Sequence, residues 1–147
     1  MEIKKASVLT GTLALGGMLV GGIADAKPGA PTPCEPSAKA CVSLSTNQTW
    51  LTENGHATYG PVPNAAGKPD APTPTGVFHV NSKDADHRSN EFNNAPMPNA
   101  VFFAPGGVAF HEGSLEKSSN GCVHLSTTAA KRFFDSLNPG DEVQVLP

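Results

Sequence analysis

The sequence predicts a mainly β fold with a single helix near the C-terminal end. Glycine and proline make up 15 and 14 of the 147 residues, which suits short strands joined by turns better than helices. Several short segments alternate apolar and polar side chains, the period of a half-buried strand. Residues 127–137 alone combine a helical apolar stripe with clear start and stop signals.

The strand pattern runs through most of the chain. In chain order, the predicted strands cover residues 41–45, 49–52, 56–62, 76–80, 101–103, 108–111 and 142–146. Asn54-Gly55 predicts a hairpin, because both residues tolerate the positive φ of a type I′ turn. Prolines between residues 61 and 74 forbid regular structure there, and Pro105-Gly106-Gly107 marks another turn. The polar segment 81–99 is predicted to be a loop.

The helix prediction rests on residues 127–137. Ser126 can accept hydrogen bonds at the N-cap, and Pro139-Gly140 ends the helix. Its apolar positions repeat with helical spacing: Ala129, Ala130, Phe133, Phe134 and Leu137.

The first 26 residues have the pattern of a secretory signal peptide. Lys4 and Lys5 precede an uncharged, mostly apolar segment over residues 6–23, and Ala24-Asp25-Ala26 offers small residues at a cleavage site. We expect cleavage before Lys27, and hence a secreted or cell-envelope location. A retained membrane anchor is the alternative, although the glycine-rich segment falls short of the roughly 20 apolar residues that a span prefers.

The remaining chain is expected to hold one domain. Residues 27–40 are expected to form an extended, mobile, proline-rich leader, and residues 41–147 the domain, acting as a monomer. The net charge of −3 and the pI of about 5.9 give no basic surface for nucleic acid or an anionic membrane.

Three cysteines leave at least one thiol without an intrachain partner. In an oxidising compartment, a bridge between Cys34 and Cys41 closes a small ring worth roughly 2–3 kcal/mol. Cys122 is then the free thiol. Bridges from Cys34 or Cys41 to Cys122 remain alternatives, and either would remove the free thiol.

The surroundings of Cys122 favour a nucleophile. It follows Gly121 in a polar turn, with His111 upstream as a base that can take the thiol proton. The N–H groups of Gly121 and Cys122 can stabilise an oxyanion, and the Asn120 amide can add a third donor. We expect a thiolate–imidazolium pair that lowers the thiol pKa. The alternative is a buried structural cysteine.

These residues together resemble the L,D-transpeptidase catalytic domain, also called the YkuD domain, from about residue 41 to residue 146. The resemblance rests on His111-Glu112-Gly113, the segment from Ser119 to Leu125, the segment from Thr73 to Phe78, and Pro139-Gly140 before the last strand. Three positions depart from the family pattern: Asn120 stands where a histidine is common, His124 where arginine or asparagine is common, and Glu112 follows the base.

The resemblance implies a β-sandwich with the helix beside it, after the active-site cysteine. It implies an exported cysteine acyltransferase that acts on peptidoglycan stem tetrapeptides and forms 3→3 cross-links through a thioester, with no cofactor. L,D-carboxypeptidase or endopeptidase activity on the same bonds is the alternative. The resemblance also implies that carbapenem-type β-lactams acylate the cysteine.

The predicted site therefore has Cys122 as nucleophile and His111 as base, with Gly121, Asn120, Ser119 and His124 around them. His124 either contacts the stem-peptide carboxylate or faces solvent. A zinc site of His111, Cys122, His124 and His87 has poor spacing, so no metal is expected. A further alternative is a non-catalytic module that binds the cell wall, but such a module would have no use for a reactive thiol. The Asp84–Arg88 cluster is expected to be a solvated loop or part of a lid, and His56 and His79 are expected to be structural.

Overall fold

The computed structural model describes residues 29–147. The expected signal segment therefore lies outside the described residues. Within residues 29–147, no helix is long and apolar enough to cross a membrane.

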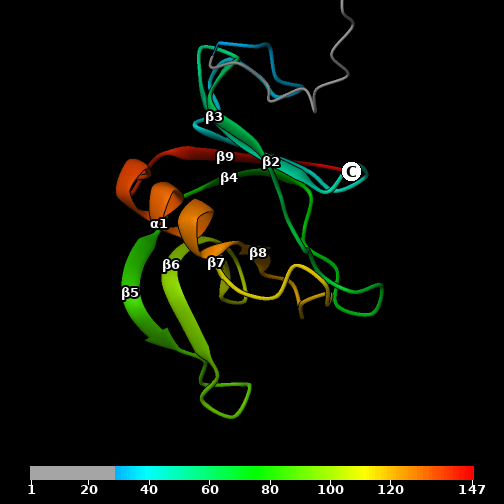
Figure 1. Cartoon of the computed structure of the whole chain (residues 1–147), viewed down its shortest axis with the longest axis vertical. Coiled ribbons are helices and arrows are strands. Elements are labelled where there is room, and N and C mark those ends of the chain that lie inside the picture. The colour runs from blue at the N-terminus through cyan, green and yellow to red at the C-terminus, as the bar shows by residue number, and fades with distance from the viewer. Residues whose placement is uncertain (1–28) are drawn as a thin grey trace, which may run out of the picture.

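Nine strands form two sheets, with one helix after the eighth strand (Figure 1). The strands are β1 Ala40–Ser43, β2 Gln48–Glu53, β3 His56–Pro63, β4 Gly76–His79, β5 Ser82–Arg88, β6 Pro96–Ala104, β7 Val108–Glu112, β8 Val123–Leu125 and β9 Glu142–Leu146. The first sheet has the order β3-β2-β1-β9-β4, and the second has β5-β6-β7-β8. The structure thus confirms the mainly β fold and a strand at each of the seven predicted places. The strand predicted at residues 101–103 is longer and begins at Pro96, and β5 and β8 were not predicted.

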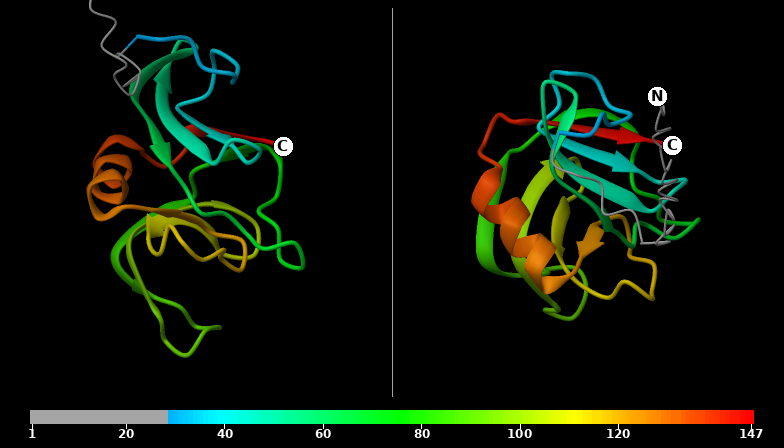
Figure 2. Two further views of the ribbon diagram at one scale, coloured as in Figure 1. Left: turned by 45° about the vertical axis from the view of Figure 1, so that its right-hand side comes forward. Right: turned by 45° about the horizontal axis from the view of Figure 1, so that its top comes forward.

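The main core is built from side chains of both sheets and the helix. Figure 2 shows how the two sheets and the helix are arranged around it. Phe110 lies at its centre, with its ring centroid 4.7 Å from Phe103 and 5.1 Å from Phe133 of the helix. Tyr59 of β3, in the first sheet, also packs against Phe133, with the two ring centroids 6.3 Å apart. These aromatic contacts fix the second sheet, which carries the site, against the rest of the domain.

The helix α1 spans Thr127–Ser136 and lies along one side of the two sheets (Figure 2). The Ser126 hydroxyl accepts a hydrogen bond from the Ala129 N–H at 3.2 Å, as the predicted N-cap requires. Ala129, Ala130 and Phe133 are buried. Because β8 ends at Leu125, only Ser126 separates this strand from the helix, and the whole segment after Cys122 is held rigidly.

The loop predicted over residues 81–99 is wrong. Most of this segment belongs to strands, β5 and the first half of β6, joined by a turn over residues 89–95. β5 is the outer strand of its sheet and most of its side chains are exposed, so it lacks the apolar alternation that marks a half-buried strand. Lys83 still anchors it, because its ammonium donates to the Phe134 carbonyl at 2.8 Å and lies over that ring.

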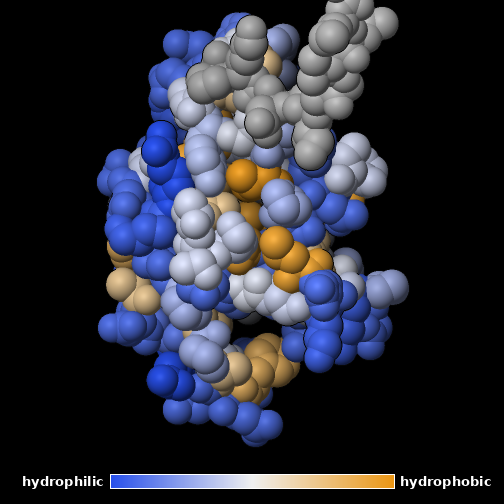
Figure 3. All heavy atoms as spheres, in the orientation of Figure 1, coloured by the Kyte–Doolittle hydropathy of each residue, from blue (hydrophilic) through white to orange (hydrophobic). Residues whose placement is uncertain are grey.

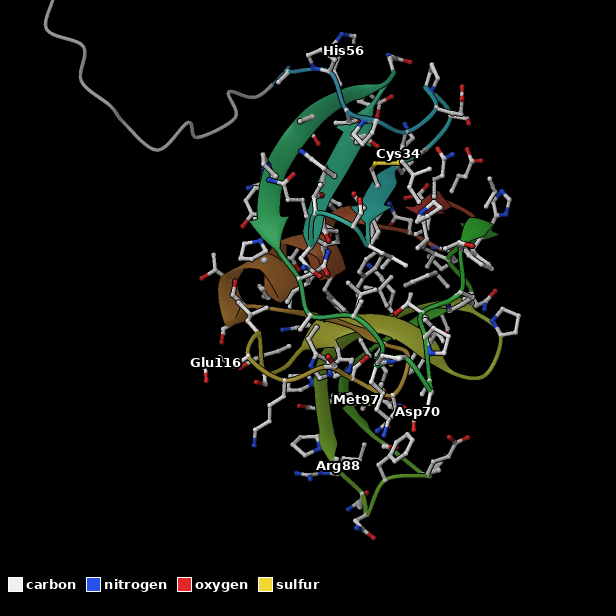
Figure 4. All side chains as sticks on the ribbon, turned by 90° about the vertical axis from the view of Figure 1, so that its right-hand side faces the viewer. Cys34, His56, Asp70, Arg88, Met97 and Glu116 are labelled. Carbon is white, nitrogen blue, oxygen red and sulfur yellow. A yellow bond between two sulfur atoms is a disulfide. The ribbon has the colours of Figure 1, made fainter. Side chains whose placement is uncertain are left out.

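The described part of the expected mobile leader, residues 29–40, packs against the rest of the domain. The Gly29 N–H donates to the Ala57 carbonyl, and the Ala57 N–H donates to the Ala30 carbonyl at 2.7 Å, so the segment lies along β3. Cys34 and Cys41 form a disulfide. Both cysteines are buried in a small second core with Ala38, Trp50 and Ala57. The folded unit therefore begins before residue 41, and Figure 4 shows Cys34 at the opposite end of the molecule from Arg88.

Candidate active site

The site lies on the outer face of the second sheet. Side chains alternate across its strands, so Phe110 of β7 and Val123 of β8 enter the main core. Their neighbours His111 and His124 therefore point to the other face, where the two residues are paired in the parallel β7–β8 register. Cys122 comes directly before β8 and lies on this same face.

These side chains line one cavity of about 410 Å³. Its walls are formed by the strands of the second sheet, the turn over residues 89–95 and the loops around residues 106 and 118, and include His87, Glu91, Phe92, Met97, Phe102, Gly107, His111, Glu112, Ser119, Asn120, Cys122 and His124. Figure 3 shows the surface hollowed above the lower lobe, which Figure 1 identifies as the β5–β6 hairpin. Of the six predicted catalytic and substrate-binding residues, five line this cavity, and Gly121 is the exception.

His111 is buried and its ring is held in one tautomer. The Nδ1 atom lies 2.7 Å from the Glu112 carbonyl oxygen. Because a carbonyl can only accept, Nδ1 carries the hydrogen and Nε2 keeps a lone pair. Burial lowers the pKa of His111 from 6.5 to about 4, so its ring is neutral at pH 7. The geometry gives a neutral imidazole that is ready to accept a proton.

Cys122 is the free cysteine of the described chain and is partly buried. Its sulfur lies 3.6 Å from the Gly107 carbonyl, and it packs against an apolar cluster that includes Met97 and Phe102. Burial raises the pKa of the thiol, and the Glu91 carboxylate acts in the same direction. Burial therefore acts against the expected thiolate–imidazolium pair in this state, because it disfavours the charged form of both side chains.

The turn before Cys122 is held by Ser119, which is buried. Its hydroxyl accepts from the Gly121 N–H at 3.0 Å and donates to the Cys122 carbonyl. The Gly121 N–H, predicted to be an oxyanion donor, is bound to Ser119 in this structure, and this geometry does not support that role. Gly121 has φ of +128°, a region that L side chains rarely adopt, which explains the glycine before Cys122.

His124 lies beside His111 and is half-buried. The two rings meet edge to face with centroids 4.7 Å apart, and His124 Nδ1 donates to the Ser114 carbonyl at 3.0 Å. A Cβ on Gly113 would lie 2.7 Å from the His124 ring, so only glycine fits there. His124 thus supports the His111 ring and lines the cavity. Asn120 also lines the cavity and is exposed.

Several cavity residues lie outside the predicted set of catalytic and substrate-binding residues. His87 donates from Nδ1 to the Asp84 carboxylate at 3.1 Å, and its ring meets Phe102 edge to face at 4.8 Å. Glu91 and Phe92 enter from the turn over residues 89–95. The expectation of a solvated loop at Asp84–Arg88 is wrong because β5 brings His87 to the cavity wall. No apolar alternation in the polar segment 81–99 indicated that β5 pairs with β6.

Other candidate sites are not built by the described residues. Among residues 29–147, no group of three or more histidine, cysteine or acidic side chains could hold a metal ion. His56 and His79 lie in β3 and β4, as predicted, and both are exposed.

The fold and the site define a two-sheet β domain with one helix and a cavity that holds a cysteine and a histidine. The sequence model of the YkuD family, the L,D-transpeptidase catalytic domain, matches residues 37–145. The chain therefore belongs to the L,D-transpeptidase catalytic domain family. The resemblance inferred from the motifs is confirmed, including residues before the predicted boundary at 41.

The chain is also similar to individual L,D-transpeptidases. L,D-transpeptidase 1 of Mycobacterium tuberculosis is 29% identical over 122 residues, which cover 71% of this chain and 48% of the relative. The L,D-transpeptidase structure from Stackebrandtia nassauensis superposes with a TM-score of 0.70 and 25% identity, over 78% of this chain and 58% of the other. The structure of LdtMt1 in complex with imipenem has a TM-score of 0.66 and 26% identity, over 73% and 57% of the two chains. The chain thus spans about half the length of the named relative.

Proposed function

We propose that this protein is an exported L,D-transpeptidase that acts on peptidoglycan stem peptides through a thioester on Cys122. The observation that carries the proposal is the shared cavity of Cys122 and His111, in which the His111 Nδ1–H is bound to Glu112 and Nε2 keeps its lone pair. A thiol and a neutral base in one cavity are the minimum for acyl transfer.

In the first half of the reaction, the donor is a stem tetrapeptide. The Cys122 sulfur attacks the carbonyl carbon of the third residue, a diamino acid, whose peptide bond links it to D-Ala. His111 Nε2 takes the thiol proton at the same time. The carbonyl oxygen becomes an oxyanion, stabilised by the Cys122 N–H and the Asn120 side chain. The C–N bond then breaks, His111 returns the proton to the leaving D-Ala nitrogen, and a thioester remains.

In the second half, the side-chain amine of another stem attacks the thioester. His111 takes the amine proton and gives it to the departing sulfur, which restores the thiol and leaves a 3→3 cross-link. Neutral partners suit this cycle, because His111 must accept a proton twice. The lowered pKa of His111 keeps its ring unprotonated at neutral pH.

Two further parts of the proposal rest on the chain's chemistry. The Cys34–Cys41 disulfide supports an oxidising compartment, and the N-terminal pattern of Lys4, Lys5 and the Ala24–Ala26 site supports export. The relative LdtMt1 has been solved in complex with imipenem, which supports acylation of Cys122 by carbapenems here.

The test is product analysis with a purified disaccharide-tetrapeptide. The protein should release D-Ala and form dimers in which the third residue of one stem is linked to the third residue of another. Mass spectrometry detects both products. Tripeptide without dimers would instead indicate an L,D-carboxypeptidase that transfers the acyl group to water. Folded wild-type protein that gives neither product would contradict the proposal, and Cys122→Ser is the matched control that should give no product.

A further inference from the structure

The turn that carries Cys122 has a second anchor outside the cavity, at Thr73. The Thr73 hydroxyl donates to the Gly121 carbonyl at 2.7 Å and accepts from the Gly67 N–H at 3.0 Å. Thr73 is only 3% exposed, so no bulk water replaces these bonds. This residue lies 48 positions before Gly121 in the chain, and the contact is therefore made by the fold.

This hydrogen bond fixes the direction of one peptide group. The Gly121 carbonyl and the Cys122 N–H belong to the same peptide, and in a trans peptide they point in opposite directions. Thr73 holds the carbonyl from its own side, where it lines a separate hollow with Gly67 and Lys117. The Cys122 N–H consequently points away from Thr73, while the Cys122 side chain lines the active-site cavity.

The peptide needs such an anchor because glycine precedes it. Rotating the peptide between Gly121 and Cys122 changes ψ of Gly121 and φ of Cys122, and glycine resists such a change least. The neighbouring Gly121 N–H is already bound to Ser119, so the candidate oxyanion donor is the N–H of Cys122 itself. Without the Thr73 hydroxyl, this donor loses its fixed direction.

We propose that Thr73 is a positioning residue for the oxyanion hole: it turns the Cys122 N–H toward the developing oxyanion by holding the Gly121 carbonyl. The inference rests on the proposed acyl transfer at Cys122. It does not depend on the identity of the peptidoglycan substrate, because any acyl donor develops the same oxyanion.

The test compares two reactions of Cys122. Acylation by p-nitrophenyl acetate passes through an oxyanion, whereas alkylation by iodoacetamide needs the thiolate but forms no oxyanion. We expect Thr73→Val to slow acylation by a factor of about ten or more, and to leave the rate of alkylation and its pH profile unchanged. Thr73→Ser keeps the hydroxyl and should acylate at nearly the wild-type rate. Thr75→Val, at an exposed position of the same segment, is the matched control and should change neither reaction.

Three outcomes would overturn the proposal. The first is an unchanged acylation rate in Thr73→Val. The second is an equal loss of acylation and alkylation, which would mean that Thr73 only stabilises the loop. The third is wild-type acylation no faster than that of free cysteine at the same thiolate concentration, which would mean that no oxyanion hole assists.

A wild-type measurement covers the case in which Thr73→Val does not fold. Acetaldehyde forms a hemithioacetal with a thiol and places an oxygen where the oxyanion develops. The amide proton of Cys122 should then shift downfield in the NMR spectrum, and an unmoved resonance would contradict the proposal. A protein that acylates with the ester but gives no product from the tetrapeptide would refute the proposed substrate while leaving the role of Thr73 intact.

Discussion

The two faces of the second sheet differ sharply, although the same strands build both. Phe110 is fully buried between aromatic rings, whereas His111, the next residue of β7, faces the cavity with a free Nε2. Val123 and His124 of β8 divide in the same way. Adjacent residues of one strand thus serve different purposes: one packs in the core and the next lines the cavity. A substitution on the core face should change the stability and leave the activity of the folded protein unchanged, and a substitution on the cavity face should do the reverse.

The largest expected effect follows from removing the proposed base, His111, on the cavity face. His111→Gln should lower the turnover of the tetrapeptide about 10²–10⁴-fold, because no group then takes the thiol proton. Its free energy of unfolding at pH 7 should change little. The two measurements are product formation and urea denaturation on the same preparation. A variant that keeps wild-type turnover would move the base elsewhere, with His124 as the first candidate.

The neighbouring position on the core face should behave in the opposite way. Phe110→Ala should lower the free energy of unfolding by about 3–5 kcal/mol, because it leaves a cavity among Phe103 and Phe133. The rate per folded molecule should remain close to that of the wild type. Urea denaturation measures the first quantity, and active-site titration of Cys122 corrects the second. A large loss of rate per titrated thiol would show that the two faces are coupled.

The pH dependence of stability should report the desolvated ring on the cavity face. The pKa of His111 is lowered from 6.5 to about 4, so the unfolded chain binds a proton before the folded chain does. Stability is then lost as pH falls from 6.5 to 4, by about 3 kcal/mol in total. In His111→Gln this loss should be absent. Urea denaturation at several pH values gives both curves, and parallel curves would contradict the burial of a neutral ring.

The smallest expected effect concerns the disulfide, which lies far from the cavity. Replacing Cys34 and Cys41 together by serine should cost about 2–3 kcal/mol, because a ring with a sequence separation of 7 restrains the unfolded chain. The buried position of both cysteines beside Trp50 adds to this cost. Turnover should stay unchanged below the melting temperature, which a thermal scan with a parallel activity assay would test.

Local patterns predicted most of the fold, because the half-buried strands alternate and Ser126 marks the helix start. They failed at β5, where an outer strand has no apolar face, and at residues 29–39, whose order comes from contacts with β3 and the small core. Similar limits apply to the site. The motifs singled out Cys122 and His111 as candidates. Long-range contacts alone reveal that the Thr73 hydroxyl holds the Gly121 carbonyl, and that burial lowers the pKa of His111 and raises the pKa of the Cys122 thiol.

The central claim is that Cys122 is the residue acylated in this cavity. Its most direct test is the mass of the protein after incubation with imipenem, followed by peptide mapping. We predict a single covalent adduct in wild-type protein, located on Cys122, and no adduct in Cys122→Ala. An adduct that persists in Cys122→Ala, or wild-type protein that iodoacetamide labels at Cys122 but imipenem does not, would contradict the claim.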